Sequence, residues 1–66
     1  MTREEAEAVA ARLVDTFAHP SILGNRTYHC LLVAGREVGA TFTGEETEAM
    51  ASKWREAIVR ALVESL

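Results

Sequence analysis

The chain has 66 residues, of which 48% are hydrophobic and 26% charged, and its formal net charge is −3. This composition excludes a disordered chain and a polycation that holds phosphates by charge alone, and the length leaves room for one domain over residues 1–66. Since no apolar run approaches the ~20 residues that span a bilayer, and acidic residues occupy the N-terminal segment, we expect a cytoplasmic protein with no membrane partner.

The soft metal ligands of the chain are few. Cys30 is the only cysteine, so one copy cannot form a disulfide within itself. His19 and His29 are the only histidines, whereas structural zinc sites take four ligands. We therefore predict no metal and no cofactor. Domains this small usually need a further support, and oligomerisation is the one that remains.

The N-terminal segment has the pattern of an amphipathic helix. Thr2 and Glu5 have the spacing of a capping box, in which each side chain satisfies a backbone N–H of the other residue. Apolar residues then recur at helical spacing at Ala6, Val9, Ala10, Leu13, Val14 and Phe17. This pattern predicts a helix over residues 3–18.

A connection follows this helix. Pro20 disfavours helical geometry in the residue before it, so the helix is expected to end near this point. We assign residues 19–26 to the connection. Ile22 and Leu23 are apolar within it, and we expect them to cover part of the core.

Two short segments have the composition of β-strands. Residues 27–33 and 38–42 are rich in β-branched and aromatic side chains, which favour strands. Gly35 and Arg36 lie between them, and glycine at the first central position is typical of a type II′ turn. The two segments are therefore predicted to form an antiparallel hairpin.

That turn also predicts the register and the two faces of the hairpin. The cross-strand pairs are expected to be Val33 with Val38, Leu31 with Ala40 and His29 with Phe42, all on one face. Because strand side chains alternate, Tyr28, Cys30 and Leu32 are expected on the opposite face.

A second helix is predicted over residues 44–65. Thr43 and Glu46 form another capping-box pattern, and the core positions are Met50, Trp54, Ala57, Ile58, Ala61 and Leu62. The predicted fold is therefore α+β, in the order α-β-β-α, with two amphipathic helices packed on one face of the hairpin. Dimerisation would extend the sheet to four strands.

Such a fold carries more apolar surface than one copy is expected to bury. A hairpin of six or seven residues per strand is about 20–23 Å long, whereas a 22-residue helix is about 33 Å long and overhangs it. We expect a partner to contact the uncovered sheet face and the overhanging helix end, through Tyr28, Cys30, Leu32, Val59, Val63 and Leu66. The alternative is that one chain folds over these residues itself.

No pattern in the sequence indicates catalysis. His29 and Cys30 are adjacent on a strand and point to opposite faces, so they cannot form a thiolate–imidazole pair. The acidic runs lie at helix starts, where the backbone dipole favours carboxylates. We predict a protein that is not an enzyme, although a small enzyme or ligand carrier built around Cys30 or His29 is a third hypothesis.

The leading interpretation is a protein–protein interaction module. It would act as a small adaptor, regulator or inhibitor, such as those that phage or mobile elements direct at host machinery, and it would bind another protein, itself as a homodimer, or both. The alternative is a small nucleic-acid-binding domain that uses the hairpin tip and the basic residues of the second helix. Its contacts would be Arg26, Arg36, Lys53 and Arg55, although the acidic excess argues against it.

Overall fold

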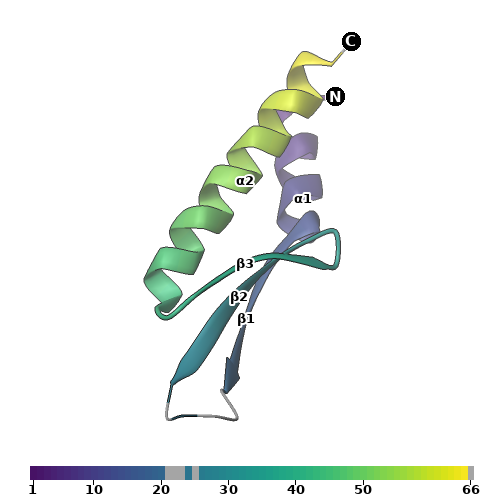
Figure 1. Ribbon diagram of the computed structural model, residues 1–66. Coiled ribbons are helices and arrows are strands. Elements are labelled where there is room, and N and C mark those ends of the chain that lie inside the picture. The colour runs from purple at the N-terminus through teal and green to yellow at the C-terminus, as the bar shows by residue number, and fades with distance from the viewer. Residues whose placement is uncertain (21–23, 25, 66) are drawn as a thin grey trace.

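The computed structural model describes residues 1–20, 24 and 26–65. The elements are α1 (Arg3–Leu13), β1 (Val14–Pro20), β2 (Thr27–Val33), β3 (Arg36–Thr41) and α2 (Gly44–Glu64). The strands form one antiparallel sheet in the order β1-β2-β3 (Figure 1). The predicted α+β class is confirmed, and the sheet has one strand more than expected. No helix within the described residues is long and apolar enough to cross a membrane.

The helix α1 and the sheet follow one another along α2. The N-terminal half of α2 lies over the sheet, and its C-terminal half lies beside α1 (Figure 1). The molecule is accordingly elongated, with principal extents of 48 × 19 × 14 Å. The end of α2 that overhangs the sheet is therefore covered by α1.

The predicted exposure of this overhang is thus partly wrong. Val59 packs against Ala6 and Ala10 of α1 and is only 4% exposed. Val63 is half-buried against the same cluster. Small alanine side chains let the two helix backbones approach closely, so one copy buries much of the apolar surface that was expected to require a partner. Leu66 lies outside the described residues.

The first helix begins as predicted and ends earlier. The Thr2 hydroxyl accepts a hydrogen bond from the Glu5 N–H (3.2 Å), and the Glu5 carboxylate accepts one from the Thr2 N–H (3.0 Å). The Thr2 N–H and the Thr2 hydroxyl both donate to the Glu5 carboxylate, and these two bonds lower the pKa of Glu5. The helix ends at Leu13 rather than at residue 18, and the last five residues of the predicted helix belong to strand β1.

Strand pairing explains this early end. Val14 lies opposite Val33, and Pro20 lies opposite Thr27, so the whole segment hydrogen-bonds along β2. The Leu13 carbonyl, left without a helical partner, accepts a hydrogen bond from the Ala34 N–H at 2.8 Å. Pairing satisfies an edge of β2 that would otherwise face solvent, and this long-range gain outweighs the helical periodicity.

The hairpin turn lies one residue earlier than predicted. Ala34 and Gly35 both have positive φ, at 52° and 80°. Two consecutive residues with positive φ define a type I′ turn, whose twist matches that of the flanking strands. The predicted type II′ turn at Gly35 and Arg36 is therefore wrong.

The shifted turn changes the register and the faces of β3. Val33 lies opposite Arg36 rather than Val38, and Leu31 lies opposite Gly39 rather than Ala40. The register shifts between Leu31 and Leu32, where a β-bulge leaves Val38 without a partner. Because a one-residue shift moves side chains to the other face, Ala40 and Phe42 leave the face on which they were predicted.

Two apolar clusters hold the molecule together. Leu31, Val14 and Ala51 are buried between α2 and the sheet, and the second cluster is the contact between α1 and α2 described above. Ile58 packs against both clusters and joins them. A single long helix therefore supplies one side of the whole core.

The start of α2 is fixed by hydroxyl groups. Thr43 caps it by accepting a hydrogen bond from the Glu46 N–H (3.2 Å), which is the first half of the predicted capping box. The buried Thr47 hydroxyl lies 3.1 Å from the His29 carbonyl and 3.2 Å from the Thr43 carbonyl, and also contacts the Thr41 hydroxyl. This contact ties α2 to β2 and β3. Ile22 and Leu23, the predicted core cover, lie outside the described residues.

Candidate functional site

The helix α2 covers only one face of the sheet. Leu31 points toward α2, so the residues on either side of it in β2 point away. We call this opposite face the outer face, and its members come from all three strands and from the chain just after β3. They are Asp15, Phe17, His19, Tyr28, Cys30, Leu32, Glu37, Ala40 and Phe42.

Four aromatic rings lie in a row across the outer face. The ring centroids of Phe17 and His19 are 6.3 Å apart, and those of His19 and Tyr28 are also 6.3 Å apart. The Tyr28 and Phe42 rings are closer, at 5.2 Å, and are tilted by 39°. Distances of 4.5–7 Å are those of interacting aromatic pairs. The rings therefore form one continuous surface, which we call the aromatic row.

A cation ends the aromatic row. The guanidinium carbon of Arg26 lies 4.9 Å from the centroid of the Phe42 ring, within the range of a cation–π contact. Arg26 is exposed, so the charge remains accessible. The row thus offers apolar faces with one fixed positive charge at its end.

The row is unusually exposed for such large side chains. Phe17 is 46% exposed and Phe42 is 54% exposed, whereas Tyr28 and Leu32 are half-buried. Single exposed apolar residues are common, but adjoining aromatic rings on one uncovered face are typical of interaction surfaces. The outer face is therefore the candidate functional site.

Cys30 lies at the centre of the outer face but is buried beneath it. Its cross-strand neighbours are Phe17 and Ala40. The Glu37 carboxylate accepts a hydrogen bond from the thiol, and this bond, with burial and the negative charge of Glu37, raises the pKa of Cys30. His29 is on the other face, with its ring near Gly44. The thiol therefore has no imidazole partner in His29.

We expect Cys30 to react slowly with thiol reagents. A raised pKa keeps the protonated thiol at neutral pH, and the thiolate is the reactive form. Replacing Glu37→Gln removes the adjacent charge and should increase the rate of iodoacetamide modification several-fold at pH 8, measured by mass spectrometry. The exposed Glu45→Gln is the control and should leave the rate unchanged. Equal rates in all three proteins would contradict the Glu37 contact.

The raised pKa of Cys30 also makes the stability of the folded protein depend on pH. Because the folded protein holds the thiol proton more tightly than the unfolded chain, this contribution to stability is complete below the pKa of an unfolded cysteine. It is lost as the pH rises through the higher pKa of the folded state. The contribution of Cys30 therefore declines only in alkaline solution.

The structure separates the predicted partner-binding residues. Tyr28 and Leu32 lie on the outer face as predicted, whereas Cys30 is buried there and is not accessible. Val59 and Val63 lie in the contact between α1 and α2, away from this face. Whether any of these residues binds a partner stays a prediction.

Most of the aromatic row was missing from the sequence prediction. Phe17 was assigned to a helix and Phe42 to the covered face, so neither was placed beside Tyr28. One signal in the sequence could have found Phe17: Val14, Thr16 and Phe17 are β-branched or aromatic residues, which favour strands. Nothing in the sequence indicated the one-residue shift that brings Phe42 to the outer face.

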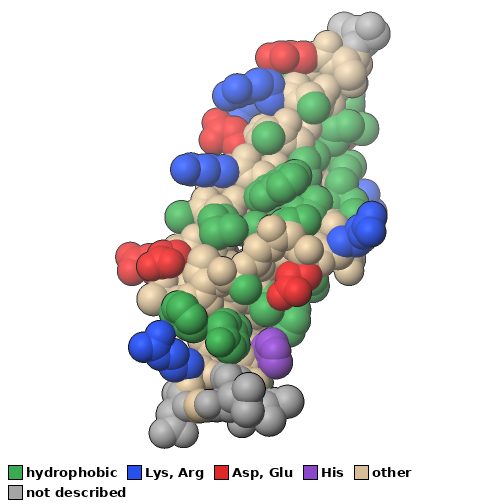
Figure 2. Space-filling view, in the orientation of Figure 1, with side chains coloured by type: hydrophobic (Ala, Val, Ile, Leu, Met, Phe, Trp, Pro, Cys, Tyr) green, Lys and Arg blue, Asp and Glu red, His purple; other side chains and the backbone are tan. Residues whose placement is uncertain are grey.

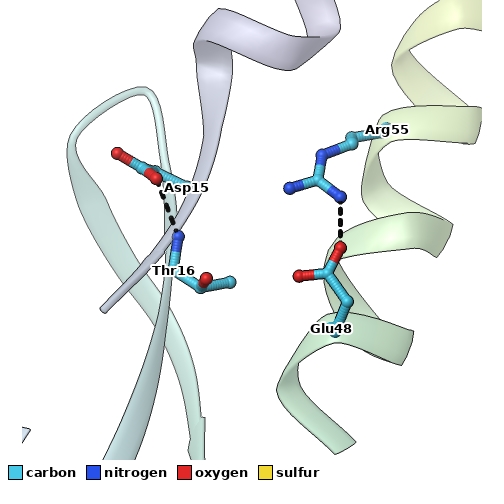
Figure 3. Close-up of polar contacts among 4 residues, drawn as sticks. All are labelled: Asp15, Thr16, Glu48 and Arg55. Atoms are coloured by element: carbon cyan, nitrogen blue, oxygen red, sulfur yellow. Dashed lines mark hydrogen bonds and ion pairs between the residues drawn. The ribbon is translucent and has the colours of Figure 1, made fainter. Parts of the chain in front are cut away.

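The basic residues of the nucleic-acid alternative do not gather into one patch. Arg26 joins the aromatic row, Arg36 starts β3 next to the hairpin turn, and Lys53 is on α2. The Arg55 guanidinium is bound to the Glu48 carboxylate at 2.7 Å (Figure 3). Only Arg26 therefore lies beside the aromatic rings.

A shallow groove lies between the two helices. It has a volume of about 280 Å³ and is lined by Arg3, Glu7, Ala10, Ser52, Arg55, Glu56 and Val59. Arg3 pairs with Glu7 at 3.7 Å, and Arg55 pairs with Glu48, so both arginines in the lining already have a carboxylate. The groove offers no free charge to a ligand through these two residues.

Comparisons with models of protein families, with curated proteins and with solved structures find no match to this chain. The fold and the outer face are therefore the basis for the function proposed below.

Proposed function

We propose that this protein is a non-catalytic protein-binding module, acting as a small adaptor, regulator or inhibitor, and that it binds its partner through the outer face. The observation that supports the proposal is the aromatic row: four adjoining rings on a sheet face that α2 leaves uncovered. Burying such rings against a partner releases water from a large apolar area, which is the main source of binding free energy.

The chemistry of the row indicates the kind of partner. Its rings would pack against apolar side chains, and the guanidinium of Arg26 at its end would pair with a carboxylate. The arginine is held over Phe42, so less side-chain entropy is lost when it pairs. We therefore expect a protein surface with an apolar centre and an acidic margin.

The test compares two exposed apolar positions. Phe42→Glu changes the aromatic row, whereas Leu13→Lys changes an exposed leucine at the end of α1. A protein isolated from the host lysate by the immobilised wild-type chain is purified, and its affinity for each variant is measured by calorimetry. We expect Phe42→Glu to weaken binding at least tenfold, because it replaces an exposed aromatic contact with a charge, and Leu13→Lys to leave it unchanged. Equal affinities for both variants would refute the outer face as the binding site.

Single-stranded nucleic acid is the second candidate, because one observation favours it. Aromatic rings and an arginine on an open antiparallel sheet are the groups on which unpaired bases stack. The net charge of −3 opposes it, and Glu37 lies close to the row. The same variants serve as the test: a labelled oligonucleotide should bind at low salt, weaken steeply with added salt, and lose affinity with Phe42→Glu. No binding at low salt would exclude this candidate.

A further inference from the structure

The two edges of the sheet differ in how they can accept another strand. An edge strand presents every second N–H and C=O group away from the sheet, and these groups can pair with a further strand. Strand β1 forms one edge and β3 the other. Their outward groups show which edge is open.

The β1 edge is closed by its own residues. The Thr16 N–H points away from β2 and donates to the Asp15 carboxylate at 3.0 Å (Figure 3). By alternation, the next outward positions are Ala18 and Pro20, and proline has no N–H to donate. Of these three positions, only Ala18 keeps an N–H for another strand.

The β3 edge lies on the opposite side, nearest the viewer in Figure 1. Since Val33 and Arg36 close a two-residue turn, Arg36 faces β2 and the next N–H, that of Glu37, faces outward. Beyond the bulge Gly39 faces β2, and Ala40 faces outward. The outward-facing residues Glu37 and Ala40 both carry an N–H that can donate to another strand. Between Glu37 and Thr41, the middle of β3 is uncharged.

An apolar surface of α2 adjoins this open edge; it consists of Met50, Trp54 and Ala57, and we call it the Trp54 shelf. Met50 lies over β3, because its terminal methyl is 2.7 Å from the position a Cβ would take at Gly39. Trp54 is one turn further along the same side of α2 and is 42% exposed. With Lys53 and Ala57 it lines an apolar depression of about 260 Å³. Figure 2 shows hydrophobic side chains in a band between α2 and β3.

We propose that two copies of this chain associate by antiparallel pairing of their β3 strands about a two-fold axis, giving a six-stranded sheet with the Trp54 shelf in the interface. A strand paired with itself in this way is self-complementary, as a two-fold dimer requires. The charged residues Arg36 and Glu37 lie near one end of β3, so pairing about its centre places them opposite the uncharged residues at the other end.

The same arrangement covers Trp54. Helix α2 contacts all three strands, so the two α2 helices of a dimer would lie over the central strands of their own sheets, about three strand spacings of ~4.8 Å apart. That separation, roughly 14 Å, exceeds the 8–10 Å at which helices pack directly. The large side chains of Met50 and Trp54 from both copies would fill the space. One interface thus accounts for the open edge and for the exposed tryptophan.

The test uses matched proline substitutions on the two edges. Ala40→Pro removes an outward N–H from β3, and Ala18→Pro removes an outward N–H from β1; both alanines are exposed. Mass is measured by light scattering over about 1–200 µM, and folding is checked by circular dichroism. We expect wild type and Ala18→Pro to be dimers, and Ala40→Pro to dissociate at concentrations at least tenfold higher than wild type does.

A second variant keeps the test decisive if Ala40→Pro does not fold. Ala57→Glu places a charge on the shelf at an exposed helical position that favours glutamate, and it should also weaken the dimer at least tenfold. Trp54, the only tryptophan, reports the contact directly: its emission should shift to shorter wavelength as wild type dimerises. A wild-type monomer throughout, or a dimer unaffected by Ala40→Pro or Ala57→Glu, would overturn the proposal. Since these measurements use the purified chain alone, they are independent of the binding test on Phe42.

Discussion

Replacing Leu31→Ala is expected to lower the free energy of unfolding by about 2–5 kcal/mol, the range for leucine truncation in a packed core. Leu31 is fully buried and lies in the cluster that joins β2 to α2 and β1. In a domain of this length the total stability is only on the order of 3–10 kcal/mol. The variant should therefore be partly or largely unfolded at 37 °C, as measured by thermal and urea denaturation followed by circular dichroism.

Leu32→Ala is the matched control for this prediction. Leu32 is the next residue of the same strand, but it lies on the outer face and is half-buried. Its truncation should cost only about 1 kcal/mol, because less apolar surface is lost and no closed cavity is left. If the two variants had equal free energies of unfolding, or if Leu32→Ala had the lower one, α2 would not cover the face to which Leu31 is assigned.

The second large effect is expected at the junction of helix and strand. Val14→Ala should lower the free energy of unfolding by about 2 kcal/mol, because it removes two buried methyl groups and leaves a cavity in their place. Val14 is buried against Leu31 and Ala51 and is the first residue of β1. Alanine also favours a helix over a strand, so the substitution weakens both the packing and the local preference for β1.

The adjacent Leu13→Ala separates packing from local preference. Leu13 is the last residue of α1 and is partly exposed, and leucine and alanine both favour helices. Its truncation should change the free energy of unfolding by less than about 0.5 kcal/mol in the same urea titration. A larger loss for Leu13→Ala than for Val14→Ala would mean that the helix continues past Leu13.

Local patterns in the sequence identified those features that depend on neighbouring residues. The capping box at Thr2, the start of α2 near Thr43 and the extended conformation of β2 were all predicted. Each rests on hydrogen bonds or side-chain spacing within one element, so the sequence contains the whole cause. The α+β class follows from the same patterns.

The errors occurred where distant segments decide the outcome. The helix pattern from Val14 to Phe17 was real, but the backbone gains more by pairing with β2. The turn moved to Ala34 and Gly35, where two positive φ angles match the twist of the strands and the Ala34 N–H reaches Leu13. Both outcomes depend on hydrogen bonds between segments that are distant in sequence.

The candidate site is the consequence of those two differences. Had the helix continued to residue 18, Phe17 would lie in a helical stripe, and with the predicted register Phe42 would face α2. The amino-acid sequence alone determined the class of fold, the helix starts and the supply of apolar side chains. Only the tertiary structure decided which of them remain exposed together, because long-range strand pairing assigns every side chain of β1 and β3 to one face or the other.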